Sequence, residues 1–195
     1  MEILLVKAMF YAFSCTFARG YTPTQTAGHG TLAQLYMALN TSEPIWLIKR
    51  TYNEADQKCV YSQKLKLDMN GNTYEFVQYY TKNGTPKQEH LHGHLSMKTA
   101  SGVPGPAMTV KKLKDATTSG IEYILVAWEE KNHCGILYFK DKDGKPKCEL
   151  HAWNSSAEEA LTSCDGTYNT YCNSYKEGST EQIVYSNDCR IQPGC

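Results

Sequence analysis

The chain has 195 residues, a length typical of one domain that can bury a sizeable core. Its 20 basic and 20 acidic residues cancel, so no global charge would draw it to nucleic acid or to an anionic membrane. No nucleophile-elbow, zinc-protease, P-loop or dinucleotide-binding motif occurs, so we expect neither an enzyme nor a bound cofactor.

The first twenty residues have the features of a secretory signal peptide. Lys7 precedes an apolar run over residues 8–18, and Ala18-Arg19-Gly20 fits a small-x-small cleavage site. The run is too short to span a bilayer. We therefore expect residues 1–20 to be removed and residues 21–195 to form a single domain, with an N-terminal buried helix as the alternative.

The cysteines and sequons indicate an oxidising, extracellular compartment. Eight cysteines occur, and Cys15 drops out with the presumed signal peptide. Seven remain, which predicts three bridges plus one spare thiol or an intermolecular bond. No C-x-x-C pair supports a zinc site. Three N-x-S/T sequons lie in turn-like stretches, as surface glycosylation of a secreted protein requires: Asn40, Asn83 and Asn154.

The hydrophobic pattern predicts one short helix and then strands. Apolar residues recur at helical spacing over residues 29–39, with Thr31 as the N-cap. The period then changes to two over eight runs joined by short turns: 45–52, 58–67, 73–80, 90–98, 108–113, 121–129 and the two arms of a hairpin at 134–153. Eight antiparallel strands in a meander can close into a barrel that encloses one small ligand. A helix beginning near Ser155 or Ser156 and a short strand at 183–185 follow.

The last arm of the hairpin places a carboxylate within a strand. Glu149, His151 and Trp153 share one face of this strand, and Leu150 lies on the other. If the first face points inward, a carboxylate beside aromatic rings suits a small organic cation. If Leu150 points inward, Glu149 is solvated. The alternation alone slightly favours the second arrangement.

Three histidines alternate along the fourth strand, so they share a face and could chelate a metal: His90, His92 and His94. The opposite face carries Leu91 and Leu95, which belong in a core. We therefore expect the histidines to face water and predict no metal site.

Five local matches, in their order and spacing, are similar to the salivary lipocalins of ticks, the group that includes the histamine-binding proteins. They are residues 47–52 (LIKRTY), 58–60 (KCV), 132–134 (NHC), 148–150 (CEL) and the late cysteines Cys164 and Cys189. The resemblance implies an all-β, closed eight-stranded antiparallel up-and-down barrel, with a short N-terminal helix and a C-terminal helix packed outside. It also implies the bridges Cys59–Cys189 and Cys134–Cys164 and suggests Cys148–Cys195, which leaves Cys172 over.

The resemblance also implies a ligand site. In the histamine binders a tyrosine at the position of Tyr52 and a glutamate at that of Glu149 line an internal amine site, which favours an inward Glu149. The family's Asp-Ala-Trp in the N-terminal helix is missing, and an acid expected before Cys134 has Glu122 and Tyr123 as its closest substitutes. His151 replaces a tryptophan.

Arg50 introduces an alternative, because it has the same strand parity as Tyr52. An inward Arg50 could neutralise Glu149 or hold the carboxylate of a lipid. We expect a secreted, non-enzymatic protein that sequesters a host inflammatory mediator, first histamine or a related amine, bound by Glu149 with Tyr52, Tyr123, Trp46 and His151 nearby. The alternatives are a fatty acid, leukotriene or sterol-like lipid in the same cavity, or an outer surface that binds a host immune or complement protein.

Overall fold

The structure is a computed structural model that describes residues 30–98, 104–113, 119–176 and 180–189. The expected signal peptide and Cys195 lie outside these residues. The elements, in chain order, are α1 (Leu32–Leu39), β1 (Ile45–Arg50), β2 (Gln57–Asp68), β3 (Thr73–Lys82), β4 (Thr85–Lys98), β5 (Gly105–Lys112), β6 (Ile121–Glu129), β7 (Cys134–Lys140), β8 (Pro146–Trp153), η2 (Asn154–Ser156), α2 (Ala160–Ser163), α3 (Asp165–Cys172), η3 (Asn173–Tyr175) and β9 (Gln182–Ile183).

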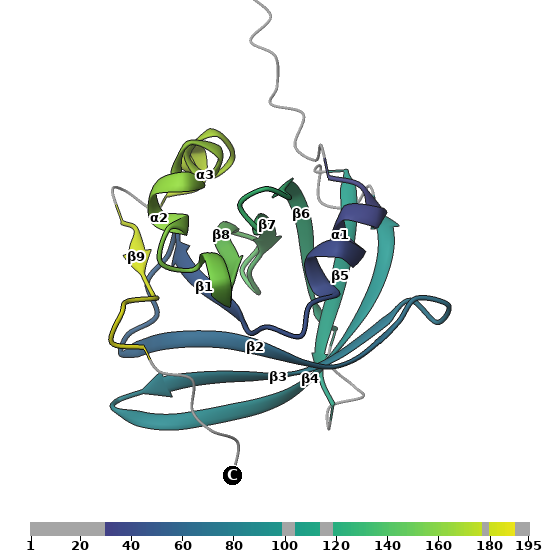
Figure 1. The fold of residues 1–195 in the computed structure, drawn as a ribbon, viewed down its shortest axis with the longest axis horizontal. Helices are drawn as coiled ribbons and strands as arrows, with labels where there is room; N and C mark the ends of the chain where they lie inside the picture. The colour runs from purple at the N-terminus through teal and green to yellow at the C-terminus, as the bar shows by residue number, and fades with distance from the viewer. Residues whose placement is uncertain (1–29, 99–103, 114–118, 177–179, 190–195) are drawn as a thin grey trace, which may run out of the picture.

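Strands β1 to β8 form a closed antiparallel barrel (Figure 1). Each strand from β2 to β8 pairs with its neighbour in sequence, and β1 pairs with both β8 and β2. The first half of β1 pairs with β2, whereas its second half pairs with β9, which places Gln182 opposite Arg50. The predicted eight-stranded up-and-down barrel is therefore confirmed, with β9 as an additional strand.

Apart from β4, the predicted strands agree with the observed ones to within three residues at either end. β4 begins at Thr85, although its first residues are exposed and show no apolar alternation. The turn before it explains the extension. Asn83 and Gly84 both have positive φ, at 51° and 72°, the geometry of a two-residue hairpin turn that pairs Lys82 with Thr85 at once.

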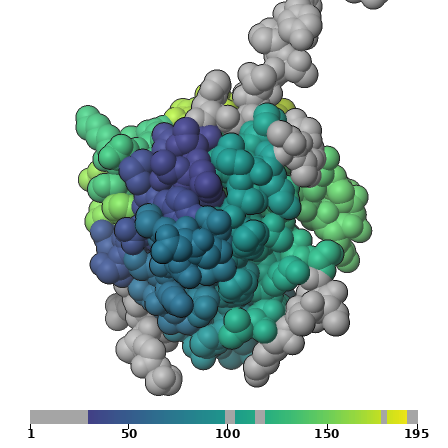
Figure 2. All heavy atoms as spheres, turned by 90° about the vertical axis from the view of Figure 1, so that its right-hand side faces the viewer, coloured from purple at the N-terminus to yellow at the C-terminus, as the bar shows by residue number. Residues whose placement is uncertain are grey.

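Helix α1 closes one end of the barrel. Thr31 caps it through a capping box in which its hydroxyl accepts from the Gln34 amide at 3.2 Å. Its apolar face buries Leu35 and Leu39 among lumenal side chains of β3 to β6. In Figure 2 the helix, in purple, lies against the β2–β3 hairpin and the strands that follow it.

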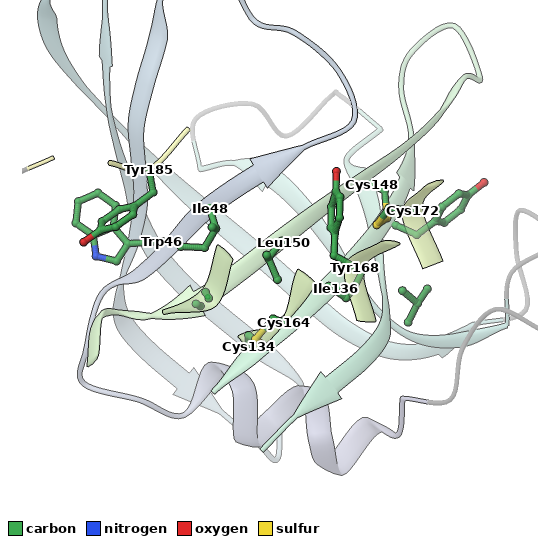
Figure 3. Close-up of a cluster of buried hydrophobic side chains, with 14 of the residues drawn as sticks. Trp46, Ile48, Cys134, Ile136, Cys148, Leu150, Cys164, Tyr168, Cys172 and Tyr185 are labelled. Atoms are coloured by element: carbon green, nitrogen blue, oxygen red, sulfur yellow. A yellow bond between two sulfur atoms is a disulfide. The ribbon is translucent and has the colours of Figure 1, made fainter. Parts of the chain in front are cut away.

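Helices α2 and α3 cover the outer face of β7 and β8 (Figures 1 and 3). The buried cluster beneath them includes Trp46, Ile136, Leu150 and Tyr168. The sequence predicted one C-terminal helix beginning at Ser155 or Ser156. The structure instead has a 3-10 turn and two short helices that meet at Cys164, whose sulfur is bonded to Cys134.

Three disulfides join the described residues, and one pairing differs from expectation. Cys59–Cys189 and Cys134–Cys164 are present, as the resemblance implied. Cys148 is bonded to Cys172, so the expected Cys148–Cys195 bridge is wrong, and Cys172, whose partner the sequence left open, pairs with Cys148. The reason is geometric: α3 folds back over β8, which brings its last turn within 5.5 Å, Cα to Cα, of Cys148.

The three sequons predicted as glycosylation sites lie on the surface of the protein. The side chains of Asn40, Asn83 and Asn154 are all exposed. Within the described residues, no helix has both the length and the apolar character needed to cross a membrane.

Candidate ligand-binding cavity

A cavity of about 500 Å³ lies inside the barrel, in the half away from α1. One wall is formed by β1, β7 and β8, with Arg50, Leu137 and Glu149 facing the space. The opposite wall comes from β3 to β5. It carries the apolar side chains Phe76, Leu91, Met108 and Val110 and also the polar ones Gln78, Glu89, Lys111 and Lys112. This volume suits one small organic ligand.

A β-bulge in β1 decides which residues of that strand face the cavity. The register with β8 shifts between Leu47 and Lys49, so Leu47 lies opposite His151 and Arg50 lies opposite Glu149. The extra residue reverses the alternation: Leu47 and Arg50 both line the cavity, although three positions separate them. The inward orientation of Glu149 and the outward one of Leu150 follow from the same register.

The same bulge places Trp46 outside the cavity. Its side chain is 1% exposed in the outer cluster, against Tyr61 and Tyr185, and its indole Nε1 donates to Asn154 Oδ1 at 2.8 Å. Figure 3 shows it in this cluster, beside Tyr185. The expectation that Trp46 forms a wall of the ligand site is wrong, because even-numbered residues before and after the bulge face opposite sides of β1.

Glu149 is a buried, charged group on the cavity wall. Its side chain is 7% exposed. His151 Nε2 donates to its Oε2 at 2.8 Å, and the Tyr52 hydroxyl donates to its Oε1. Burial alone would raise the pKa of this carboxyl, but His151, Tyr52 and the nearby Arg50 together hold the pKa below its usual value. Glu149 is therefore ionised at neutral pH.

Arg50 is a second buried charge in the same wall, 2% exposed. Its Nε donates to Gln182 Oε1 at 2.8 Å, and its Nη1 donates to Gln57 Oε1, also at 2.8 Å. Its Nη2 has no hydrogen-bond partner among the described residues. The guanidinium carbon lies 4.9 Å from the centre of the Tyr52 ring.

Two aromatic rings, those of Tyr52 and Tyr123, line the end of the cavity near these charges. Phe139 packs against both from outside the cavity and lines a neighbouring space instead. Tyr52 meets Phe139 edge to face at 5.8 Å, and Tyr123 lies 4.7 Å from the same ring, centroid to centroid. Burial, and then the charge of Glu149, raise the pKa of both tyrosines, so their hydroxyls stay protonated and can donate. The two tyrosines were predicted from the sequence, whereas Phe139 was not. Its strand reads Ile136-Leu137-Tyr138-Phe139, apolar on both faces, so alternation could not show which residues point inward.

A smaller cavity of about 70 Å³ lies between this site and α1. His151 and Leu137 line both spaces, so the side chain that contacts Glu149 also separates the two cavities. Two buried polar groups on the walls of the smaller cavity, the Tyr74 hydroxyl and the Trp128 indole N–H, have no partner among the described residues. Neither group was predicted from the sequence, because Tyr74 and Trp128 are single residues of β3 and β6 that belong to no motif.

The histidines of β4 lie on the outer face of the barrel, opposite Leu91 and Leu95, and do not line either cavity. Elsewhere in the described residues, the side-chain ligand atoms of Glu129, Cys134 and Cys164 lie within 4.8 Å of one another. Both of these cysteines are consumed in a disulfide, so they offer no thiolate to a metal.

Comparison with known proteins identifies the family. The family model for tick histamine binding protein matches residues 25–191. The structure of AM182 in complex with serotonin aligns at a TM-score of 0.56 and 16% identity, over 82% of this chain and 94% of that one, which shows a shared barrel fold.

Two further solved structures align less closely. Japanin from Rhipicephalus appendiculatus bound to cholesterol gives a TM-score of 0.48 at 15% identity, over 78% of this chain and 97% of its own. Insecticyanin from the tobacco hornworm Manduca sexta gives 0.43 at 19% identity, over 78% of this chain and 80% of its own. Among curated proteins, none matches the chain. Because the family match covers most of its length, the chain belongs to the tick histamine-binding protein family, as its local sequence matches implied.

Proposed function

We propose that this protein is secreted and sequesters a small biogenic amine, histamine or serotonin, inside the barrel. The observation that carries the proposal is Glu149, an ionised carboxylate buried in the wall of a cavity large enough for such a ligand. A buried charge is costly unless it is paired, so a cationic ligand that pairs with Glu149 gains affinity from a group already in place.

The surroundings of Glu149 suit the rest of an amine ligand. The aromatic ring of histamine or serotonin would meet Tyr52 and Tyr123 at one end, and apolar side chains of β3 to β5 opposite. The family's name and the serotonin bound to AM182 favour the same ligand class. Capture of this kind is stoichiometric, and the proposed role is to deplete a host inflammatory mediator.

Arg50 favours a second candidate, a ligand that carries a carboxylate. Its guanidinium is buried in the same wall and keeps one nitrogen, Nη2, without a partner among the described residues. A fatty acid or leukotriene could place its carboxylate at this nitrogen and its chain along the apolar side chains of the opposite wall. The carboxylate of Glu149, directly opposite Arg50 on β8, disfavours this arrangement because it would repel the ligand.

Calorimetric titration separates the two candidates. Wild type, Glu149→Gln and Arg50→Gln are each titrated with histamine, serotonin and arachidonate. Under our proposal Glu149→Gln weakens amine binding at least about tenfold, because interactions with a charged group contribute about 1.5–3 kcal/mol. Arg50→Gln leaves amine binding intact or strengthens it, because it removes a nearby positive charge.

The titration also has outcomes that reject the proposal. Arachidonate binding that depends on Arg50, without amine binding, supports the second candidate. If no small molecule binds and a pull-down from host plasma retains one specific protein, the outer surface is the functional one. Unchanged amine affinity in Glu149→Gln would remove Glu149 from the site.

A further inference from the structure

Arg50 and Glu149 lie directly opposite each other on neighbouring strands, and both side chains face the cavity. Opposite charges in such a cross-strand pair are close enough to bond, and burial makes their attraction stronger. Among the described residues, however, no nitrogen of Arg50 lies within 4.0 Å of a Glu149 oxygen. Something else holds the two charges apart.

Gln182 holds the guanidinium from one side. It belongs to β9, where it pairs with Arg50 across the backbone, and its Oε1 accepts from Arg50 Nε at 2.8 Å. The amide is itself fixed at both ends by one residue: Oε1 also accepts from the Glu54 backbone N–H at 3.0 Å, and Nε2 donates to the Glu54 carbonyl at 3.2 Å. An amide held by three bonds is a rigid acceptor, so it can orient Arg50.

Gln57 and Tyr52 complete the arrangement. Gln57, at the start of β2, accepts from Arg50 Nη1 at 2.8 Å. The guanidinium therefore connects side chains of β2 and β9, the two strands with which the first and second halves of β1 pair. The ring of Tyr52 lies against the guanidinium while its hydroxyl donates to Glu149. One tyrosine therefore contacts both charges, although the two charges do not pair with each other.

β9 is anchored independently of Arg50. The Cys59–Cys189 disulfide and a hydrogen bond from the Cys59 amide to the Val184 carbonyl, 3.0 Å long, attach the segment that carries Gln182 to β2. Val184 also packs in a small buried cluster with Leu47 and Val60. Loss of the Gln182 side chain would therefore release the guanidinium without releasing β9.

We propose that Gln182 is a positioning residue that sets the ligand specificity of the cavity: it keeps Arg50 off Glu149, so that the carboxylate remains available to a cationic ligand. This inference rests on the proposed function, because it concerns the same carboxylate. A released Arg50 would pair with Glu149, and an incoming amine would then have to displace an internal cation. Amine affinity would fall although every residue that contacts the amine is unchanged.

A double-mutant cycle tests the proposal in the full chain. Histamine affinity is measured by calorimetry for wild type, Gln182→Ala, Arg50→Gln and the double variant, with Ile183→Ala as the control for general damage to β9. Ile183 is exposed and lines neither cavity. We expect Gln182→Ala to weaken binding about tenfold and Ile183→Ala to leave it unchanged. In the Arg50→Gln background, Gln182→Ala should change affinity by less than about twofold, because its effect requires Arg50.

An equal loss of affinity with and without Arg50 would overturn the proposal, since it would show that Gln182 acts only through stability. So would a Gln182→Ala variant that binds histamine as wild type does. A crystal structure of Gln182→Ala supplies a readout that needs no ligand: we expect Arg50 to lie within 4.0 Å of Glu149, the distance at which an ion pair is assigned. If wild type binds no amine but this contact forms, the proposed function fails and the role of Gln182 stands. If the guanidinium stays in place, the role of Gln182 fails alone.

Discussion

The Cys148–Cys172 bridge ties α3 to the strand that carries Glu149, and replacing Cys172 with serine tests it. The bridge joins residues 24 apart in sequence. Loop-closure entropy for that separation predicts a loss of about 3.5 kcal/mol of unfolding free energy at 25 °C. For a domain of this size, such a loss lowers the melting temperature by about 10 °C. Both sulfurs lie in the buried outer cluster, so removing the bridge also loosens packing beside Glu149.

Guanidinium unfolding of Cys172→Ser, with Cys195→Ser as the matched control, measures this loss. Family resemblance implied a Cys148–Cys195 bridge instead. With that bridge, Cys195→Ser would lose unfolding free energy and Cys172→Ser would not, so the two variants distinguish the pairings. Peptide mapping of the unreduced protein should yield one fragment that joins the peptides of Cys148 and Cys172. A fragment joining Cys148 to Cys195, or full stability of Cys172→Ser, would refute the reasoning.

Three further variants test the structure around the cavity. Trp46→Phe should lower the unfolding free energy in urea by about 1–3 kcal/mol, because it loses buried area and the hydrogen bond to Asn154. Histamine affinity should not change. Reduced affinity at full stability would place Trp46 in the ligand site. The pKa of Glu149 lies below its ordinary value of 4.5. The ionised carboxylate therefore stabilises the fold above that pH, and this stabilisation is lost as the pH falls through the lowered pKa. Melting curves of wild type and Glu149→Gln should therefore converge or cross below about pH 4.5, and parallel pH profiles would contradict this. Tyr52→Phe should weaken histamine binding about three- to tenfold, because the carboxylate loses a donor and the bound ligand loses a polar contact; unchanged calorimetric affinity would exclude that role.

The fold was predictable because local signals agree with one another. Turn residues such as Asn83-Gly84 separate the strands, and the apolar alternation of β2 to β6 identifies an inner face. The N-cap at Thr31 was predicted from its residue type, and the capping box confirms it. The C-terminal region was predicted less well, because its short helices depend on packing and disulfides rather than on a helical period.

The site was predictable only in part, for reasons that are equally physical. Residue type and family resemblance identified Glu149, Tyr52, Tyr123 and Arg50 as candidates, and all four line the cavity. Trp46 was also expected in the wall of the site, and this was wrong. Nothing in the sequence of β1 marks the bulge between Leu47 and Lys49 that turns Trp46 outward. Gln182 could not be found from sequence either. It is 132 residues from Arg50 and reaches it only because β9 folds back beside β1.

The central claim is that Glu149 is the counter-ion of a cationic ligand inside the barrel, and a crystal structure of the wild-type protein with histamine tests it most directly. We expect histamine in the cavity beside Tyr52 and Tyr123, with its ammonium within ion-pairing distance of the Glu149 carboxylate. An ammonium group placed elsewhere, or a histamine-soaked crystal in which the cavity holds a lipid whose carboxylate meets Arg50, would contradict it.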